Sequence, residues 1–141
     1  MTTQNKTLTF VVQPGAYAIA KLPHNAELPA WACSGPFFSV TRTSEELSIV
    51  VAENSLPQNF EASNGWRLLK LQGPFAFDEV GIVAAISEPL AKSHIGIFIV
   101  STYNTDYLLV QNKHVRAAVQ TLDRAGHRIL HLELLDEGNE P

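Results

Sequence analysis

The second half of the chain alternates between strand-like and helix-like patterns in an order that few folds accommodate. Trp66–Gln72 has the pattern of a strand, and Val80–Lys92 that of a helix. Ile97–Thr102 and Asp106–Gln111 are two apolar runs on either side of a short polar turn, which predicts a β-hairpin. Any fold proposed for this region must therefore place one helix between two strands and then reverse the chain within a few residues.

Two further elements complete this order. Val115–Ala125 carries apolar residues at helical spacing and is followed by Gly126, a typical residue just after a helix end. Arg128–Leu135 alternates between leucines and polar residues, which predicts a strand with one buried face. The order β-α-β-β-α-β is that of two split β-α-β units. It predicts a ferredoxin-like, α+β fold: a four-stranded antiparallel sheet with both helices on one face.

The start of the first helix is expected at Asp78. This residue is placed to cap the helix, and Glu79 would lie in its first turn, where a negative charge suits the helix dipole. Pro89 lies inside the helix and must remove one backbone hydrogen bond.

The first half of the chain is rich in strands and poor in helices. A Pro14-Gly15 turn is expected between its first two strands, and the turn-rich stretch Glu53–Gly65 reads as a linker. The sequence thus predicts an N-terminal domain over residues 1–60 and a C-terminal domain over 61–141. The strands expected in the first half are Leu8–Val12, Tyr17–Leu22, Phe38–Thr41 and Leu47–Ala52, with a short helical turn near Pro29–Cys33.

An internal repeat supports two related domains. Shifting the chain by sixty residues places FSVTRTSEELSIV on FIVSTYNTDYLLV without a gap, so that Glu46 faces Asp106. What recurs is a strand, a polar turn with an acid, and a second strand.

Composition excludes several classes of function. The chain has 141 residues, a net charge of −4 and only 10 Lys and Arg, which are scattered, so a nucleic-acid partner is not expected. The single cysteine, Cys33, excludes an internal disulfide and fits a cytoplasmic protein. The N-terminus lacks the apolar core of a secretory signal, and no apolar run approaches the length of a membrane span.

Several motifs resemble those of the small tandem ACT-domain proteins of bacteria and of the ACT domains of the animal cytosolic arginine sensor. They are FSVTRTSEELSIVV, GWRLLKLQGPFAFDEVGI and STYNTDYLLV, in order and at similar spacing. The resemblance implies two ACT-like βαββαβ units, the first one poor in helices. It also implies that amino acids or similar metabolites bind at an interface between ACT units.

By position, the resemblance points to a ligand site formed by two segments. DEVGI would contribute Glu79, Gly81 and Ile82, and STYNTD would contribute Thr102, Tyr103 and Asp106. The first half has no DxxGI sequence, which leaves open whether it binds anything.

The residue types in these segments suit an amino acid. Backbone N–H groups at Gly81 and Ile82, at a helix N-terminus, would bind a carboxylate. Asp106 and Glu79 would accept hydrogen bonds from an ammonium or a basic side chain, while Thr102 and Tyr103 would add a hydroxyl and an aromatic wall. The alternative for Asp106 is that it only shapes the turn by bonding to its own backbone.

The sequence offers little to an enzyme. No phosphate-binding loop, GxSxG or HExxH motif is present, and Cys33 has no evident activating partner. His127 and His131 have the spacing of a metal pair on a helix, but they straddle Gly126 and a predicted strand, and no third ligand is apparent. No metal or other cofactor is expected.

These observations predict a cytoplasmic homodimer that binds an amino acid as a regulatory ligand and catalyses no reaction. The alternatives are a ligand-free interaction module, or a regulatory subunit of an enzyme in amino-acid metabolism.

Overall fold

A computed structural model describes residues 7–137 of the chain. This part divides into two compact units, each of which has its own core. The N-terminal unit is Gly15–Trp66, and the C-terminal unit combines residues 7–14 with residues 67–137. The two strands that pass from one unit into the other are β1 (Thr9–Leu22) and β4 (Ser63–Leu71).

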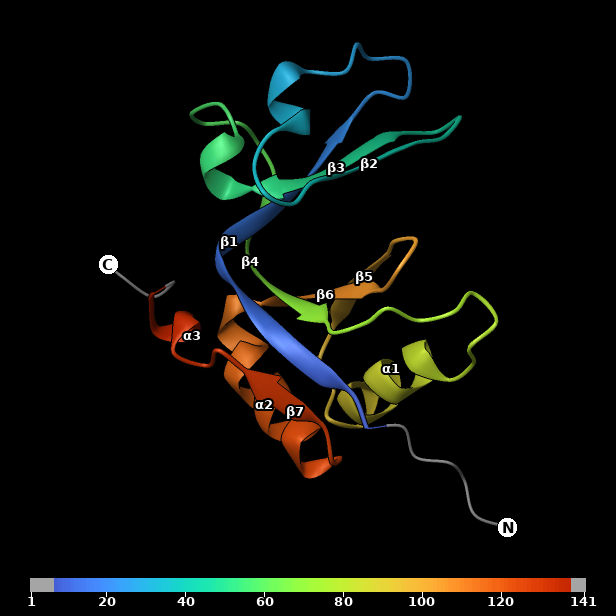
Figure 1. The fold of residues 1–141 in the computed structure, drawn as a ribbon. Helices are drawn as coiled ribbons and strands as arrows, with labels where there is room; N and C mark the ends of the chain where they lie inside the picture. Colours follow the sequence, from blue (N-terminus) through green and yellow to red (C-terminus); the bar gives the residue numbers. More distant parts are fainter. Residues whose placement is uncertain (1–6, 138–141) are drawn as a thin grey trace. The chain divides into compact units, whose positions relative to one another are not determined.

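The C-terminal unit has the predicted order of strands and helices from β4 onward (Figure 1). It is a mixed α/β fold in which β5 and β6 form an antiparallel hairpin and β7 pairs in parallel with the start of β1. The elements that follow β4 are α1 (Ile82–Lys92), β5 (Ile97–Ser101), β6 (Asp106–Gln111), η3 (Asn112–His114), α2 (Val115–Arg124), β7 (Arg128–Leu130) and α3 (Leu134–Glu137).

The sheet of this unit has one strand more than the predicted four. β1 pairs with both β7 and β4, so the strand order in the described part is β7-β1-β4-β6-β5. The Gln72 N–H group donates to the Thr9 carbonyl at 2.9 Å, which ties β1 to the end of β4. The sequence pattern of the second half could not show this, because the additional strand comes from the opposite end of the chain.

A single long strand replaces the expected Pro14-Gly15 turn. β1 spans 14 residues without a reversal. Gly15 adopts a φ of 84° within the strand, a value that glycine reaches at no steric cost. Pro14-Gly15 therefore lets one strand continue where the sequence predicted two. Because β1 runs through both compact units, these units do not coincide with the segments 1–60 and 61–141. The domain bounds given by those two segments stay a prediction.

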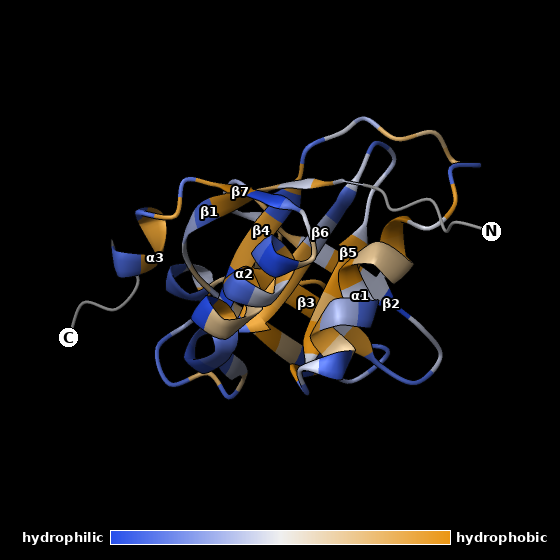
Figure 2. Ribbon diagram, turned by 90° about the horizontal axis from the view of Figure 1, so that it is seen from below, coloured by the Kyte–Doolittle hydropathy of each residue, from blue (hydrophilic) through white to orange (hydrophobic). Residues whose placement is uncertain are grey.

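The helices cover one face of the sheet through a continuous apolar core. In α2 the predicted residues Val115, Ala118, Val119 and Leu122 are all buried. They pack with alternate residues of the strands, such as Phe10 and Leu108, and with Ile86 of α1. Figure 2 shows this apolar band along the strands and the more hydrophilic outer surface of α2.

The predicted strand Arg128–Leu135 is wrong beyond Leu130. His131 has a φ of 65°, which ends the extended chain, and Leu134–Glu137 form the short helix α3. Leu132, expected to face the core, is 45% exposed, whereas Leu135 is 1% exposed. Leu134 and Leu135 of α3 thus pack on the core, and Leu132 does not.

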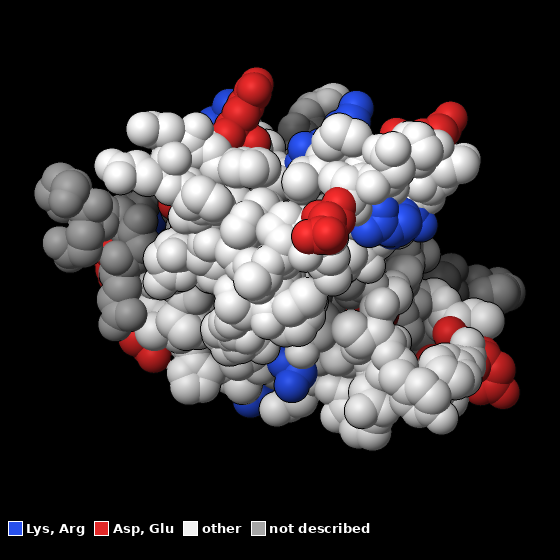
Figure 3. Space-filling view, turned by 90° about the horizontal axis from the view of Figure 1, so that it is seen from above, with Lys and Arg blue, Asp and Glu red and all other residues white. Residues whose placement is uncertain are grey.

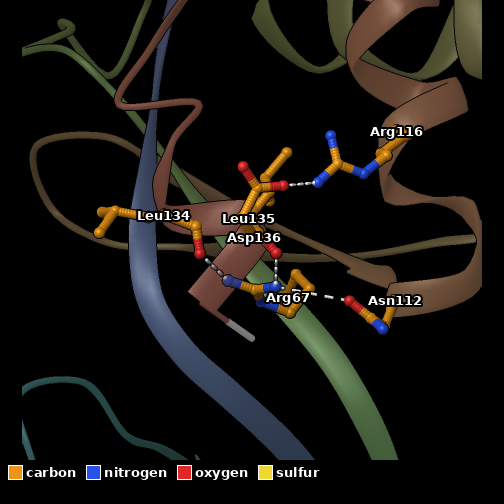
Figure 4. Close-up of polar contacts among 6 residues, drawn as sticks. All are labelled: Arg67, Asn112, Arg116, Leu134, Leu135 and Asp136. Atoms are coloured by element: carbon orange, nitrogen blue, oxygen red, sulfur yellow. Dashed lines mark hydrogen bonds and ion pairs between the residues drawn. The ribbon is translucent and has the colours of Figure 1, made fainter. Parts of the chain in front are cut away.

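One arginine holds this C-terminal segment in place (Figure 4). Arg67 of β4 is fully buried, at 0% exposure. Its guanidinium donates to the carbonyls of Leu134 and Leu135 at 2.9 and 3.2 Å, and to the Asn112 side-chain oxygen at 3.4 Å. Arg116 of α2 and Asp136 form an exposed ion pair nearby.

The N-terminal unit contains short 3-10 turns in place of α-helices. Its strands are the second half of β1, β2 (Ser39–Arg42) and β3 (Leu47–Ala52), with β3 antiparallel to both others. The turns are η1 (Ala30–Cys33) and η2 (Glu53–Ser55). Its small core groups Ala32 of η1 with Leu47, Ile49 and Val51 of β3.

His127 fixes the beginning of β1. It is 6% exposed, and its Nδ1 accepts a hydrogen bond from the Leu8 N–H group at 3.0 Å. Burial lowers the pKa of His127 below its ordinary 6.5, against the raising effect of a hydrogen bond with the Ala85 backbone. His127 thus has a structural contact at the start of β1.

The lowered pKa predicts a loss of stability in acid. The unfolded chain takes up the proton more readily than the native state, so stability is greatest above pH 6.5 and falls as the pH drops through 6.5 toward the native pKa. His127→Asn keeps an acceptor and should remove this component, at most about 1.4 kcal/mol per pH unit. Urea unfolding between pH 5 and 8 measures it.

Candidate functional site

A pocket of about 310 Å³ opens in the C-terminal unit between the segment before α1 and the β5–β6 hairpin. All six residues predicted from the sequence line it. They are Glu79, Gly81, Ile82, Thr102, Tyr103 and Asp106, and the other lining residues are Phe75, Ala76, Phe77, Val83, Ala84, Ser101, Asn104 and Thr105.

The N-terminus of α1 faces this pocket through backbone groups. α1 begins at Ile82, and Gly81 occupies the capping position with φ 87° and ψ 0° and without a side-chain cap. The predicted cap by Asp78 is therefore wrong, and Glu79 lies before the first turn. The first helical hydrogen bond runs from Ala85 to the Gly81 carbonyl at 2.9 Å. The N–H groups of the first turn, from Ile82 onward, are thus available to an acceptor.

Threonines, and not Asp106, close the hairpin turn opposite α1. The Thr102 N–H group donates to the Thr105 carbonyl at 2.8 Å, and the Thr102 hydroxyl accepts from the Thr105 N–H group at 3.4 Å. Asp106 is the first residue of β6 and pairs across the strands with Ser101, whose hydroxyl donates to its Oδ1. Asp106 is 9% exposed, and its carboxylate is at the pocket wall.

Three contacts hold the loop between β4 and α1 against this turn. The Thr105 hydroxyl donates to the Leu71 carbonyl, and the Phe75 N–H group donates to the Asn104 carbonyl, both at 2.7 Å. A Cβ atom on Gly73 would lie 3.0 Å from the Asn104 carbonyl oxygen, so glycine allows this close approach. Two walls of the pocket are therefore fixed to each other by backbone contacts.

Aromatic rings stand at the mouth of the pocket. Phe77 and Tyr103 are 76% and 77% exposed and meet edge to face, with ring centroids 4.6 Å apart. Val80 and Val83 are also exposed, at 79% and 48%. We call these four residues the apolar rim. Tyr103, predicted to supply an aromatic wall, lines the pocket and is part of this rim.

The charges of the lining residues all have the same sign. Glu79 and Asp106 are acidic, and no Lys, Arg or His is found among the described residues that line the pocket. The pocket therefore offers one carboxylate on the hairpin, Asp106, and a second, Glu79, in the segment that leads to the backbone N–H groups at the N-terminus of α1. This arrangement suits a small molecule with both a cationic and an anionic group.

The sequence did not point to the Ser101 hydroxyl, or to the backbone N–H groups of Val83 and Ala84, as polar groups of the pocket. Ser101 could have been found from the hairpin register, because a turn closed by Thr102 and Thr105 places it opposite Asp106. The donors of Val83 and Ala84 follow once the helix is known to begin at Ile82, four residues after the predicted cap.

Comparison with known proteins identifies the family of the segment that contains the pocket. A family model described as an ACT domain matches residues 61–124, which include every lining residue of the pocket. A second model, of an N-terminal domain, matches residues 15–59. A crystal structure from Agobacterium tumefaciens is 43% identical, covers 89% of this chain and 93% of its own, and has a TM-score of 0.83. The chain belongs to the ACT-domain family.

More distant ACT-domain relatives differ in size. The human cytosolic arginine sensor for mTORC1 subunit 1 is 33% identical over 96 residues, or 62% of this chain. The chain spans only about 29% of the length of that sensor. Aspartate kinase of Clostridium acetobutylicum shares the fold alone, with 15% identity, a TM-score of 0.63, and coverage of 85% of this chain and 35% of the kinase.

Proposed function

We propose that this protein binds an amino acid or a similar small metabolite in the pocket and acts as a regulatory protein without catalysis. The observation that carries the proposal is the pocket itself. It combines the N-terminus of α1 with two carboxylates, Asp106 on the hairpin and Glu79 before the helix, with no cationic side chain among the described lining residues. An α-amino acid carries a carboxylate and an ammonium, which match these two kinds of group.

A basic side chain would use the second carboxylate. The α-ammonium needs one acceptor, Asp106 or Glu79, and the other carboxylate can accept a hydrogen bond from a basic side chain of the ligand. The name of the similar animal protein, an arginine sensor, points the same way. We therefore expect L-arginine or L-lysine to bind better than neutral or acidic amino acids.

A thermal-shift screen against the twenty amino acids tests this function. A ligand at a hundred times its dissociation constant stabilises the native state by about 2.7 kcal/mol. For a chain of this size the melting temperature should rise by roughly 5–10 °C. A flat profile for all twenty at millimolar concentration would argue against an amino-acid ligand.

The lining residues support binding more than catalysis. They include no cysteine, histidine or lysine, so neither a thiolate nor a nitrogen base is at hand. Cys33 is exposed and belongs to the N-terminal unit.

Within residues 7–137 no helix is long and apolar enough to cross a membrane. A cytoplasmic location, also part of this proposal, fits a sensor of free metabolites. On the face shown in Figure 3, charged side chains are few and dispersed, which does not favour a nucleic-acid partner.

A homodimer would place the pocket at an interface between ACT units of two copies. β5 ends the strand order of the C-terminal unit, and its Ile97–Val100 stretch is entirely apolar and half-buried. Edge strands of monomeric proteins commonly carry a charge or a proline that prevents pairing, and β5 has neither. The apolar rim lies beside the same hairpin, since Tyr103 belongs to its turn.

Val100→Lys should convert the dimer to a monomer by placing a charge on this edge. Light scattering after size exclusion should give twice the 15.5 kDa chain mass for the natural protein and the chain mass for the variant. Lys113→Ala, at an exposed site outside β5, is the control. A natural protein of 15.5 kDa would contradict the dimer.

The apolar rim favours one alternative: a module, or an enzyme's regulatory subunit, that binds another protein without a ligand. Four exposed apolar side chains, three of which line the pocket, are typical of an interaction surface. Under this alternative Phe77→Ser would weaken partner binding, while no amino acid would change the melting temperature. The ligand screen thus separates the two functions.

A further inference from the structure

The two hairpins of the chain are structural repeats at an offset of 59 residues. Arg42 pairs with Leu47 at the turn end of β2–β3, as Ser101 pairs with Asp106 in β5–β6. The burial patterns of β3 and β6 are the same. The sequence alignment at sixty residues, which set Glu46 against Asp106, is therefore one residue out of register.

The turns of the two hairpins are closed by the same hydrogen bonds. The Thr43 N–H group donates to the Glu46 carbonyl at 2.9 Å, and the Thr43 hydroxyl accepts from the Glu46 N–H group at 3.1 Å. These are the bonds that Thr102 and Thr105 form beside the pocket. Each residue of the pocket hairpin therefore has a defined counterpart in the N-terminal unit.

In the N-terminal unit, the counterparts of Ser101 and Asp106 have a different chemistry. Leu47, in place of Asp106, is 0% exposed and packs on Ala32 of η1. No carboxylate is left at this position to meet a cation. Arg42, in place of Ser101, brings a cation of its own to the hairpin.

The exposed Arg42 guanidinium joins the N-terminal hairpin to the loop that follows β1. It donates through Nη1 to the His24 carbonyl and through Nη2 to the Ala26 carbonyl, the latter at 2.8 Å. Both carbonyls belong to the loop that follows β1, as residues 72–81 follow β4 and bound the pocket. A forked cation thus joins hairpin and loop without any ligand.

We propose that Arg42 is a built-in clamp that takes the place of a ligand in the N-terminal unit. The chain then binds one ligand, and only the loop of the C-terminal unit, residues 72–81, responds to it. The N-terminal loop, residues 23–29, is held closed whether or not ligand is present. The inference that each chain binds one ligand rests on the proposed function. The inference that Arg42 holds the N-terminal loop closed does not.

Hydrogen–deuterium exchange tests the clamp without a ligand. Arg42→Ala should speed amide exchange in residues 23–29 by roughly tenfold, which corresponds to about 1.4 kcal/mol. Exchange in residues 72–81 should not change. Arg42→Lys should resemble Arg42→Ala, because an ammonium cannot hold both carbonyls as a fork. Arg124→Ala, at an exposed arginine of α2, is the control. Unchanged exchange at residues 23–29 in Arg42→Ala overturns the proposal.

The same measurement with 10 mM L-arginine or L-lysine separates the clamp from the proposed function. We expect amide exchange to slow in residues 72–81 and to stay unchanged in residues 23–29. Calorimetry should give one ligand per chain. Protection of both loops, or two ligands per chain, overturns the single-site inference. If neither loop responds, the proposed function fails for these ligands, and the ligand-free comparison of Arg42→Ala still decides the clamp.

Discussion

Replacing Arg67 by alanine is expected to lower the free energy of unfolding by about 3–5 kcal/mol. The substitution removes a fully buried side chain together with the hydrogen bonds that its guanidinium donates to the Leu134 and Leu135 carbonyls. A hydrogen bond from a charged group contributes about 1.5–3 kcal/mol, and the lost packing of the long side chain adds to this. The melting temperature should fall by roughly 10 °C or more.

Two variants separate the causes of this effect. Arg67→Met keeps most of the side-chain volume without any donor, so it should recover only the packing component. Arg116→Ala removes an exposed arginine whose ion pair with Asp136 lies next to the same segment, and should cost less than about 1 kcal/mol. Urea unfolding of the three variants gives the comparison. An Arg67→Ala protein as stable as the Arg116→Ala protein would show that the contacts in Figure 4 do not hold the C-terminal segment.

Asp106→Asn should abolish most of the ligand response while the fold persists. Asparagine keeps the shape and can still accept from Ser101, but it carries no charge toward a cation. A charge-assisted hydrogen bond contributes about 1.5–3 kcal/mol, so affinity should fall about 10- to 100-fold. At a concentration that stabilises the natural protein by about 2.7 kcal/mol, a 100-fold weaker variant would gain only about 0.4 kcal/mol.

The matched control is Asp123→Asn, which removes the same charge from an exposed position on α2. Its thermal shift with ligand should equal that of the natural protein. Isothermal titration of both variants with the amino acid found in the screen gives the affinities. An Asp106→Asn protein with natural affinity would remove Asp106 from the site, even if an amino acid does bind.

The elements of the C-terminal unit could be predicted because their patterns are local. The apolar face of α2 and the bounds of β6 depend on side chains close together in sequence, and both were found as predicted. The six pocket residues were brought together for a related reason. They flank one helix start and one hairpin turn, and the ACT resemblance places these two segments beside each other.

The failures all involve contacts between distant segments or a positive φ angle. The start of α1 depends on Gly81 at φ 87°, which ends the preceding loop in a way that Asp78 does not. The short β7 depends on His131 at φ 65° and on the hydrogen bonds that Arg67 donates to α3. Neither leaves a periodic signal in the sequence.

By itself the sequence determined the repeating order of strands and helices and the absence of catalytic motifs. It also determined the two acidic positions, Glu79 before a helix and Asp106 at a hairpin. These properties reside in the identity and spacing of neighbouring residues. The tertiary structure alone decided that β1 serves both units, that threonines and not Asp106 close the pocket turn, and that Arg42 joins its hairpin to a loop. Each of these depends on pairing between residues far apart in the chain, where register and backbone angle select one partner among many.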